Sequence, residues 1–394
     1  MKIPEFYEHT TGKRVISGVD ALSHIPYELK MAGVTKPIIV TDVIVCKLPF
    51  FKKMLESLKV SGFADFDLFD QIPADSPVTI AEQIAIQYTS AECDGIIAVG
   101  GGSVLDCAKS VNLLVSTGAT KVESVMGMDH IPGNLKPFIA VPTTSGTGSE
   151  ATKVAVVSDP IKKIKIEIIT EKIIPTVSVL DPEATISLPA KVTASTGFDA
   201  LTHAIEALYS LQSNPLSRVE ALTAIELIVG NIENVIKNPK DIYSRLALAN
   251  GSYLAGCAFS NAMVGGVHAI GHAAGAVCHV AHGDIMSVLL PAVMKANLIA
   301  TKEITSELLY WLEGAEVFSS TPVEKRAEKA IESIINIRKR LKVISGLPET
   351  LSDLKIDRSQ FEEIINKALD DGASITNPVS LTREFVFKIL ESSL

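Results

Sequence analysis

The first half of the chain alternates short apolar runs with segments whose apolar residues recur every three or four positions. The apolar runs are rich in β-branched residues and have the length of strands, whereas the periodic segments are typical of amphipathic helices. This alternation predicts a parallel sheet with helices packed on its faces. The expected strands are Lys36–Asp42, Ala64–Phe69, Gly95–Gly102 and Phe138–Thr144, and the expected helices are Lys47–Val60, Val78–Ala91 and Ser103–Ser116.

Two later segments depart from this alternation. Residues Val154–Val179 are rich in Val, Ile and Lys and contain Pro160 and Pro175, which predicts a β-hairpin or a pair of edge strands. From Pro189 onward, long segments of helical period follow. We therefore expect an α/β domain over residues 1–185 and an all-helical domain over residues 186–394. The expected C-terminal helices include Ala190–Ser210, Pro215–Ile236, Ile242–Phe259, Gly266–Val277 and Val288–Ala300.

Composition narrows the class of protein. A chain of 394 residues with 47% hydrophobic residues can bury the cores of two domains. A net charge of −9 argues against a nucleic-acid surface. We expect no membrane span, because no run of 18 apolar residues occurs. The N-terminus lacks an apolar signal core, and the five cysteines form no C-x-x-C pair. These features predict buried thiols and a cytoplasmic location.

A glycine-rich turn follows the third expected strand. Glycines allow the backbone to approach a pyrophosphate closely, and the free N–H groups that open the next helix attract its charge. The spacing is not that of G-x-G-x-x-G, so a turn capped by Ser103, with Asp106 completing the cap, is the alternative. The turn consists of Gly100, Gly101, Gly102 and Ser103.

A hydroxyl-rich loop and an acidic residue follow two other strands. Residues Pro142–Glu150 read PTTSGTGSE, and their hydroxyls and glycines suit the oxygens of phosphate and ribose. An ordinary polar loop is the alternative. Asp42 ends the first expected strand, where a carboxylate accepts hydrogen bonds from ribose hydroxyls and repels the 2′-phosphate of NADP. A simple helix or turn cap is the alternative for Asp42.

Acidic and imidazole side chains cluster at two places in the helical half. Asp199 and His203 are four residues apart in a segment of helical period, which places them on one face, one turn apart. The segment Gly265–Gly283 holds four of the eight histidines. One carboxylate and three imidazoles suit a divalent transition metal such as Fe²⁺ or Zn²⁺. The four histidines are His268, His272, His279 and His282.

With these motifs in this order, the chain resembles the iron-containing (group III) alcohol dehydrogenases over nearly its whole length. The resemblance implies a Rossmann-like N-terminal domain joined to a helical C-terminal domain, the architecture of dehydroquinate synthase. It implies a metal site made of Asp199, His203, His268 and His282, with His272 beside the metal near the nicotinamide. It also implies NAD contacts from the glycine turn, Thr143, Thr144, Thr147, Thr152 and Lys165, with Asp42 selecting NAD over NADP.

The implied activity is hydride transfer between NAD and a small primary alcohol or diol, or its aldehyde. His272 is expected to relay a proton or orient the nicotinamide, or only to shape the site. Phe259, Met263 and Val264 are expected to line an apolar pocket or to pack between helices. The alternatives are a hydroxyacid–oxoacid transhydrogenase, a glycerol dehydrogenase-like enzyme, a dehydroquinate synthase-like lyase and a silent nucleotide- and metal-binding protein. By analogy with the family, we expect a homo-oligomer such as a dimer.

Overall fold

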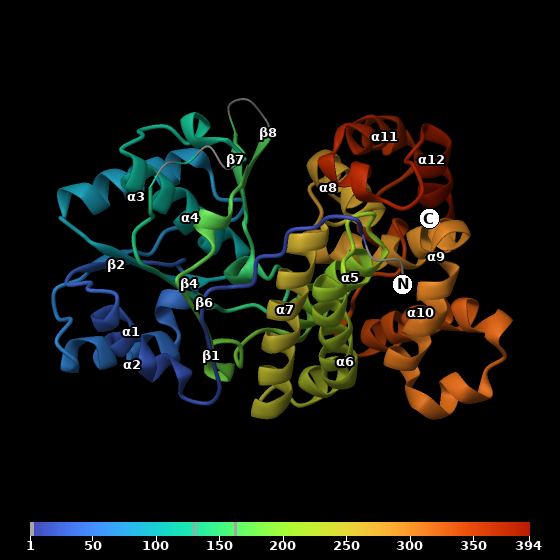
Figure 1. The fold of residues 1–394 in the computed structure, drawn as a ribbon, viewed down its shortest axis with the longest axis horizontal. Helices are drawn as coiled ribbons and strands as arrows, with labels where there is room; N and C mark the ends of the chain where they lie inside the picture. Colours follow the sequence, from blue (N-terminus) through green and yellow to red (C-terminus); the bar gives the residue numbers. More distant parts are fainter. Residues whose placement is uncertain (1–3, 129–130, 132, 161–163) are drawn as a thin grey trace. The chain divides into compact units, whose positions relative to one another are not determined.

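The computed structural model describes residues 4–128, 131, 133–160 and 164–394 (Figure 1). The chain divides into two compact units. One unit is Thr10–Leu188, and the other is Pro189–Leu394 together with residues 4–9. This division lies a few residues later than the boundary expected after residue 185, and residues 4–9, which were expected in the α/β domain, belong with the helical unit.

The unit Thr10–Leu188 is built on a six-stranded sheet in the order β1-β9-β6-β4-β2-β3. Every pairing within this sheet is parallel, which confirms the predicted parallel sheet. Two strands that the periodicity missed, β1 and β9, pair with each other at one side of it. The strands are β1 (Val15–Ser17), β2 (Pro37–Val40), β3 (Asp67–Phe69), β4 (Gly95–Gly100), β6 (Phe138–Pro142) and β9 (Val177–Leu180).

Helices cover both faces of this sheet (Figure 1). Alternate residues of a strand point to opposite faces, so one strand contributes to two separate cores. In β2, Ile38 and Val40 pack with α3 and α4, whereas Ile39 packs with α1 and α2. All three side chains are fully buried, which explains why this strand is apolar throughout. The helices are α1 (Ile25–Met31), α2 (Pro49–Val60), α3 (Val78–Ser90) and α4 (Gly102–Thr117).

A second, three-stranded sheet in the order β5-β8-β7 belongs to the same unit. Its strands are β5 (Gly127–Met128), β7 (Val154–Asp159) and β8 (Ile164–Ile169). β7 and β8 are antiparallel, which confirms the hairpin predicted from this Val- and Lys-rich segment. The end of the segment differs, because Val177–Leu180 forms strand β9 of the main sheet, where all four of its residues are buried.

The second unit is helical, as predicted. α5 packs against α6, α7 and α9 and lies at the centre of a single core cluster. α7 and α8 meet at an angle of 102°, and Met263, at the corner, has a φ of 62°. The helices are α5 (Ala190–Tyr209), α6 (Pro215–Lys237), α7 (Ile242–Ala262), α8 (Gly266–Cys278), α9 (His282–Ser320), α10 (Arg326–Ser345), α11 (Phe361–Asp370) and α12 (Arg383–Ser392).

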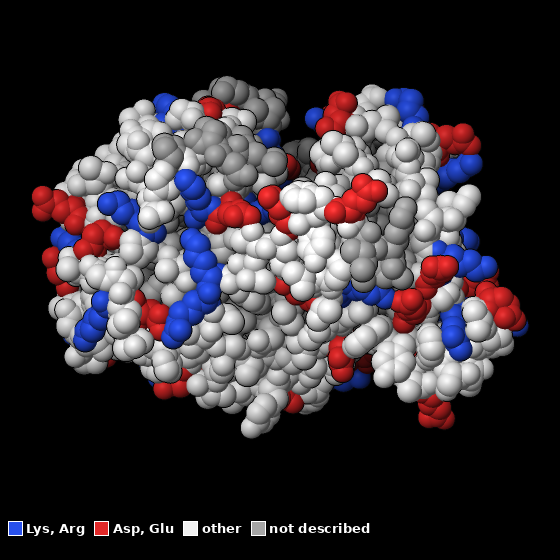
Figure 2. All heavy atoms as spheres, viewed as in Figure 1, with Lys and Arg blue, Asp and Glu red and all other residues white. Residues whose placement is uncertain are grey.

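Among the residues that the structure describes, one helix has the length and the mean hydropathy of a membrane span, although the sequence contains no uninterrupted run of 18 apolar residues. α9 is long and apolar enough on average, and 61% of its most apolar window is buried inside the protein. The buried core helices of many proteins are equally long and apolar, so α9 is weak evidence for a membrane span. On the face drawn in Figure 2, basic side chains lie scattered among acidic ones. Cys46 and Cys278 are only half-buried, which corrects the expectation that all five thiols are buried.

Candidate metal and dinucleotide sites

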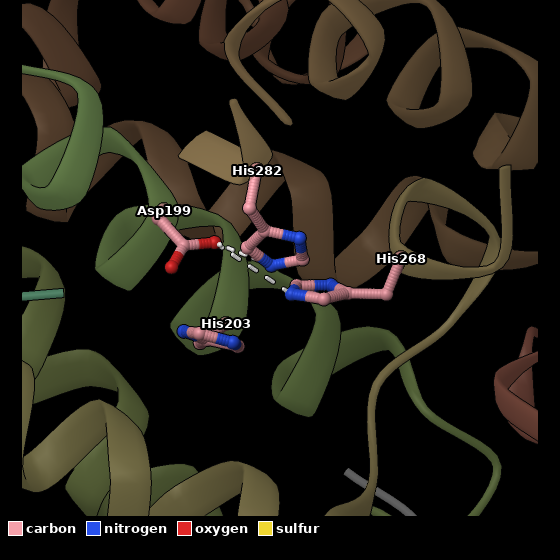
Figure 3. A group of neighbouring side chains, drawn as sticks. All are labelled: Asp199, His203, His268 and His282. Atoms are coloured by element: carbon pink, nitrogen blue, oxygen red, sulfur yellow. Dashed lines mark ion pairs between the residues drawn. The ribbon is translucent and has the colours of Figure 1, made fainter. Parts of the chain in front are cut away.

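Four side chains with the chemistry of metal ligands converge from three helices of the helical unit (Figure 3). Asp199 and His203 lie one turn apart on α5, His268 lies in the first turn of α8, and His282 is the first residue of α9. One ligand atom from each of the four lies within 4.8 Å of every other. Ligand atoms bonded to one ion at about 2.1 Å are about 3–4 Å apart, so this grouping has close to the required spacing.

The start of α9 lies very close to α5, and a glycine makes this approach possible. A Cβ atom on Gly283 would lie 2.3 Å from the backbone oxygen of Ser195 on α5. Any larger residue would therefore push the two helices apart. Because His282 immediately precedes this glycine, the close contact brings its imidazole to within 3.4 Å of Asp199, measured from Nε2 to Oδ1.

Several polar atoms at this site are buried without a hydrogen-bond partner. Asp199, His203 and His268 are at most 5% exposed, whereas His282 is half-buried. Within the part of the chain that the structure describes, Asp199 Oδ1, His203 Nδ1 and His268 Nε2 make no hydrogen bond. Leaving such groups unpaired costs about 1–3 kcal/mol each. A divalent cation satisfies a carboxylate oxygen and imidazole nitrogens together, so the donor set fits a metal ion such as Fe²⁺ or Zn²⁺.

The protonation states of the cluster also suit a cation. Burial lowers the pKa of His203 to about 3 and that of His268 well below its usual value. Burial opposes the ionisation of Asp199, but the neighbouring imidazoles hold its pKa below its usual range. Near neutral pH Asp199 is therefore a carboxylate and His203 and His268 are neutral imidazoles, which are the forms that bind metals.

A buried carboxylate orients one of these imidazoles. Glu206, one turn after His203 on α5, places its Oε2 2.6 Å from Nδ1 of His268. Its other oxygen accepts the backbone N–H of Val267 at 2.6 Å. With the imidazole proton held on Nδ1, Nε2 is left with a free lone pair on the side that faces Asp199. Burial raises the pKa of Glu206 to about 7.

His272 lies beside the cluster and has its own carboxylate partner. Its ring centroid is 5.4 Å from that of His282 and 5.6 Å from that of His268. Its Nδ1 lies 3.0 Å from Oδ2 of Asp371, whose other oxygen accepts the backbone N–H of Ala373. His272 is not one of the four grouped ligands, and the structure places His279 at the end of α8 outside that group as well.

Phe259 belongs to the wall of this site. Its ring stacks on His203 with centroids 4.3 Å apart and planes 20° apart. Phe259 therefore contacts an imidazole of the candidate site and does not only pack between helices. Met263 and Val264 are half-buried at the corner between α7 and α8.

The glycine turn and the hydroxyl-rich loop meet at the carboxyl ends of β4 and β6. The backbone N–H of Thr143 donates to the carbonyl oxygen of Gly100 at 3.0 Å. A Cβ on Gly102 would lie 2.8 Å from Thr147, and one on Gly100 would lie 2.5 Å from Val104. These glycines thus let the two loops pack at a strand edge where α/β sheets bind ligands.

The alternative interpretation of the glycine turn as a capped helix start is wrong. α4 begins without a side-chain cap. The Ser103 hydroxyl accepts the backbone N–H of Asp75, and Asp106 accepts the Ser149 hydroxyl and the N–H of Val156. The N–H groups that open α4 are consequently left uncapped by side chains, as an anion-binding helix start requires.

The remaining expected cofactor residues differ in their surroundings. Oδ1 of Asp42 accepts the N–H groups of Ile44 and Val45, so this carboxylate caps the turn after β2. Thr144 and Thr147 are half-buried at the loop surface, whereas Thr143 and Thr152 are buried. Lys165 is exposed on β8, and its Nζ lies 4.0 Å from Oδ1 of Asp75.

Comparison with known proteins decides the family. The iron-containing alcohol dehydrogenase family matches residues 12–182, and the C-terminal domain of the Fe-containing alcohol dehydrogenase family matches residues 193–394. The chain belongs to the iron-containing alcohol dehydrogenase family. Both the predicted family and the predicted fold, an α/β unit with a parallel sheet followed by a helical unit, are confirmed.

Individual members of the family match this chain along nearly its whole length. An NAD-dependent methanol dehydrogenase from Bacillus methanolicus is 31% identical over 96% of this chain and 97% of that protein. A 1,3-propanediol dehydrogenase from Klebsiella pneumoniae is 34% identical over 92% of each chain. The crystal structure of a 1,3-propanediol oxidoreductase has a TM-score of 0.93 at 31% identity and covers 99% of this chain, with all of its own chain matched.

Glu206 and Asp371, two carboxylates beside the candidate metal ligands, were not predicted from the sequence. Glu206 follows His203 by three residues, so the helical period of α5 does place it on the same face and gave a usable signal. Asp371 lies 99 residues from its partner His272, in a short segment between helices, where no local pattern marks it.

Proposed function

We propose that this protein is a metal-dependent dehydrogenase that transfers a hydride between a small primary alcohol or diol, or the matching aldehyde, and NAD(H). The observation that carries the proposal is the set of four grouped ligand atoms, three of them from buried residues, in the helical unit. The relatives of this chain support the reaction class, because they are named as methanol and 1,3-propanediol dehydrogenases.

The residues of the helical unit have separate roles in this proposal. Asp199, His203, His268 and His282 hold the metal ion, as the unpaired buried atoms of the cluster support. When bound, the ion supplies a Lewis acid that lowers the pKa of an alcohol hydroxyl, and NAD supplies the hydride acceptor. His272, held at Nδ1 by Asp371, orients the nicotinamide or relays a proton through its other nitrogen.

The α/β unit holds NAD in this proposal. The uncapped start of α4 and the glycine turn bind the pyrophosphate, and the hydroxyls of Thr144 and Thr147 lie at the surface of the adjoining loop. Asp42 accepts the ribose hydroxyls, and Thr143, Thr152 and Lys165 complete the set of cofactor contacts. We also infer that the protein is cytoplasmic and forms a homo-oligomer. Light scattering of the purified protein tests the oligomeric state.

Metal analysis combined with turnover tests the proposal. The protein is purified anaerobically, and its Fe and Zn contents are measured together with NADH production from a panel of C1–C4 alcohols and diols. We expect His268→Ala and Asp199→Asn to lose the metal and the turnover while still binding NADH. Normal turnover in either variant excludes the metal site.

The same panel separates the other candidate activities. Net NADH production from an alcohol alone excludes a transhydrogenase, in which NAD stays bound and hydride passes between two substrates. No turnover of any alcohol or aldehyde after Fe²⁺ is restored, with NADH still bound, favours a silent binding protein.

A further inference from the structure

A lysine is completely buried behind the loops assigned to NAD. Lys109, on the second turn of α4, is 0% exposed. Its ammonium group donates to the carbonyl oxygen of Thr152 at 3.0 Å, to the Thr152 hydroxyl at 2.9 Å and to the carbonyl oxygen of Val154 at 2.7 Å. A lysine has three N–H donors, and all three are used here. Lys109 therefore holds the strand that leaves the hydroxyl-rich loop and has no donor left for a ligand.

A carboxylate one turn earlier on α4 holds the same loop from its other side. Asp106 accepts the Ser149 hydroxyl at 2.6 Å and the backbone N–H of Val156 at 3.2 Å. Together, Lys109 and Asp106 bind four residues of the segment 149–156, namely Ser149, Thr152, Val154 and Val156. Two side chains of α4 thus hold this segment by hydrogen bonds, and the first residues of the same helix belong to the glycine turn.

The buried ammonium of Lys109 contributes little to the free energy of folding, because burial opposes its charge. Burial lowers the pKa of Lys109 to about 8, against the favourable charges of Asp106 and Glu150, so the fold holds this ammonium at a cost. An apolar side chain of similar length in a buried position is often at least as stabilising as a buried charge. Stability therefore does not explain why this site carries a charge. The segment that Lys109 holds suggests a role in positioning the loop.

The fastened segment determines how the two cofactor loops meet. Thr147, just before Ser149, fills the space beside Gly102, where a Cβ atom would lie only 2.8 Å away. The Ser149 N–H donates to the Thr147 hydroxyl at 3.3 Å, so a shift of Ser149 moves Thr147 as well. The spacing of Thr147 from the glycine turn consequently depends on the contacts made by Lys109 and Asp106.

We propose that Lys109 and Asp106 are positioning residues that set the hydroxyl-rich loop against the glycine turn and thereby determine the affinity for NAD. This inference rests on the proposed function, because it takes these two loops as the NAD site. Lys109 acts only through the loop, since its donors are all engaged by Thr152 and Val154. Loss of its ammonium removes the donor to the carbonyl oxygen of Thr152 and leaves that of Val154 with only the Thr152 hydroxyl as a side-chain donor, which releases the loop.

The test measures the dissociation constant for NADH by fluorescence in the metal-loaded protein. In Lys109→Met we expect this dissociation constant to rise about tenfold or more, because the three hydrogen bonds that hold the loop are lost and the loop leaves the geometry that binds NADH. We expect kcat at saturating NAD and the metal content to stay at the wild-type level. Ser149→Ala, which removes one hydroxyl contact of Asp106 and keeps Lys109, is expected to raise the constant by a smaller factor.

Asn112 provides a matched control on the same helix. It is also buried, and it binds the backbone N–H and carbonyl group of Lys136, which precedes β6 at the opposite end of that strand from the loop. Asn112→Ala is expected to lower the melting temperature and to leave the dissociation constant for NADH unchanged. This control separates loss of stability from loss of loop position.

The outcomes distinguish this inference from the proposed function. A wild-type NADH constant in folded Lys109→Met, with only a lower melting temperature, overturns the positioning role and leaves the proposed function intact. If Lys109→Met does not fold, an unchanged constant in Ser149→Ala overturns it equally. Wild-type protein that binds no NADH overturns both.

Discussion

The carboxylate beside His268 is the part of the proposed metal site whose role is most open to a direct test. Glu206 is 4% exposed and contacts two groups, Nδ1 of His268 and the N–H of Val267, both at 2.6 Å. In Glu206→Gln the amide oxygen still accepts from Val267, and the amide N–H₂ then faces Nδ1 of His268. An amide donor there moves the imidazole proton to Nε2, the nitrogen that faces Asp199.

The expected loss follows from the one contact that the substitution removes. A hydrogen bond to a charged group contributes about 1.5–3 kcal/mol. Since every 1.4 kcal/mol is a factor of about ten, the metal affinity should fall by about 10- to 100-fold. Carboxylate partners of ligand histidines have effects of this size in other metal sites.

Anaerobic competition with a chelator, followed by metal analysis of the protein, measures this affinity. NADH binding and the melting temperature of the metal-free protein show whether the fold is intact. Asp371→Asn is the matched control, because it removes a carboxylate from His272, which lies beside the ligands without being one of the grouped four. Its metal affinity should equal that of the wild type even where its turnover falls.

A Glu206→Gln variant that retains wild-type metal affinity refutes the orienting role of Glu206. That role is refuted equally if Asp371→Asn loses as much metal as Glu206→Gln, because the loss then does not depend on contact with a ligand. Reduced turnover with unchanged metal content in Glu206→Gln also contradicts it.

Four further outcomes are expected. Asp42→Asn keeps the turn contacts to the backbone but removes the charge, so kcat/KM for NADP should rise about tenfold relative to NAD; an unchanged ratio removes Asp42 from the selectivity. Gly283→Ala places a Cβ 2.3 Å from the Ser195 oxygen, and we expect about 1–3 kcal/mol of destabilisation with weaker metal retention, measured by denaturant unfolding and metal analysis. Removal of the metal by a chelator should lower the melting temperature, and restored Fe²⁺ or Zn²⁺ should raise it with concentration, because the ion binds the folded state. The pKa of Lys109 is about 8 in the folded protein and 10.5 in the unfolded chain, so the unfolded state binds more protons between these pH values. The free energy of unfolding of the wild type should therefore rise relative to that of Lys109→Met from pH 8 to pH 10.5. A difference that stays constant over this range contradicts the burial of this charge.

Local patterns in the sequence determined most of the fold. Strands buried on both faces are apolar throughout, as in Pro37–Val40, and amphipathic helices repeat every three to four residues, so both were recognisable without knowledge of their neighbours. The short edge strand Val15–Ser17 escaped recognition because it is mostly exposed and has only three residues. Val177–Leu180 was placed with the hairpin because sequence alone does not show which sheet a strand joins.

For the four grouped side chains, sequence by itself indicated which two segments carry candidate metal ligands. Spacing on one helix placed Asp199 with His203, and the density of histidines in Gly265–Gly283 marked the second half of the site. The pattern could not say which histidines join the aspartate, because that depends on the 102° corner between α7 and α8 and on the close start of α9 at Gly283. The assignment of His282 rather than His279 came from resemblance, and only the packed helices group its imidazole with Asp199.

Tertiary structure alone decided the groups that support these side chains. Asp371 reaches His272 across 99 residues, and the ammonium of Lys109 reaches Thr152 and Val154 across more than forty, so no local period signals either contact. Burial then sets the protonation of these groups, because desolvation depends on everything packed around them rather than on their sequence neighbours. The sequence thus determined the kinds of ligand and the elements that carry them, whereas packing decided their partners, their charge and their convergence.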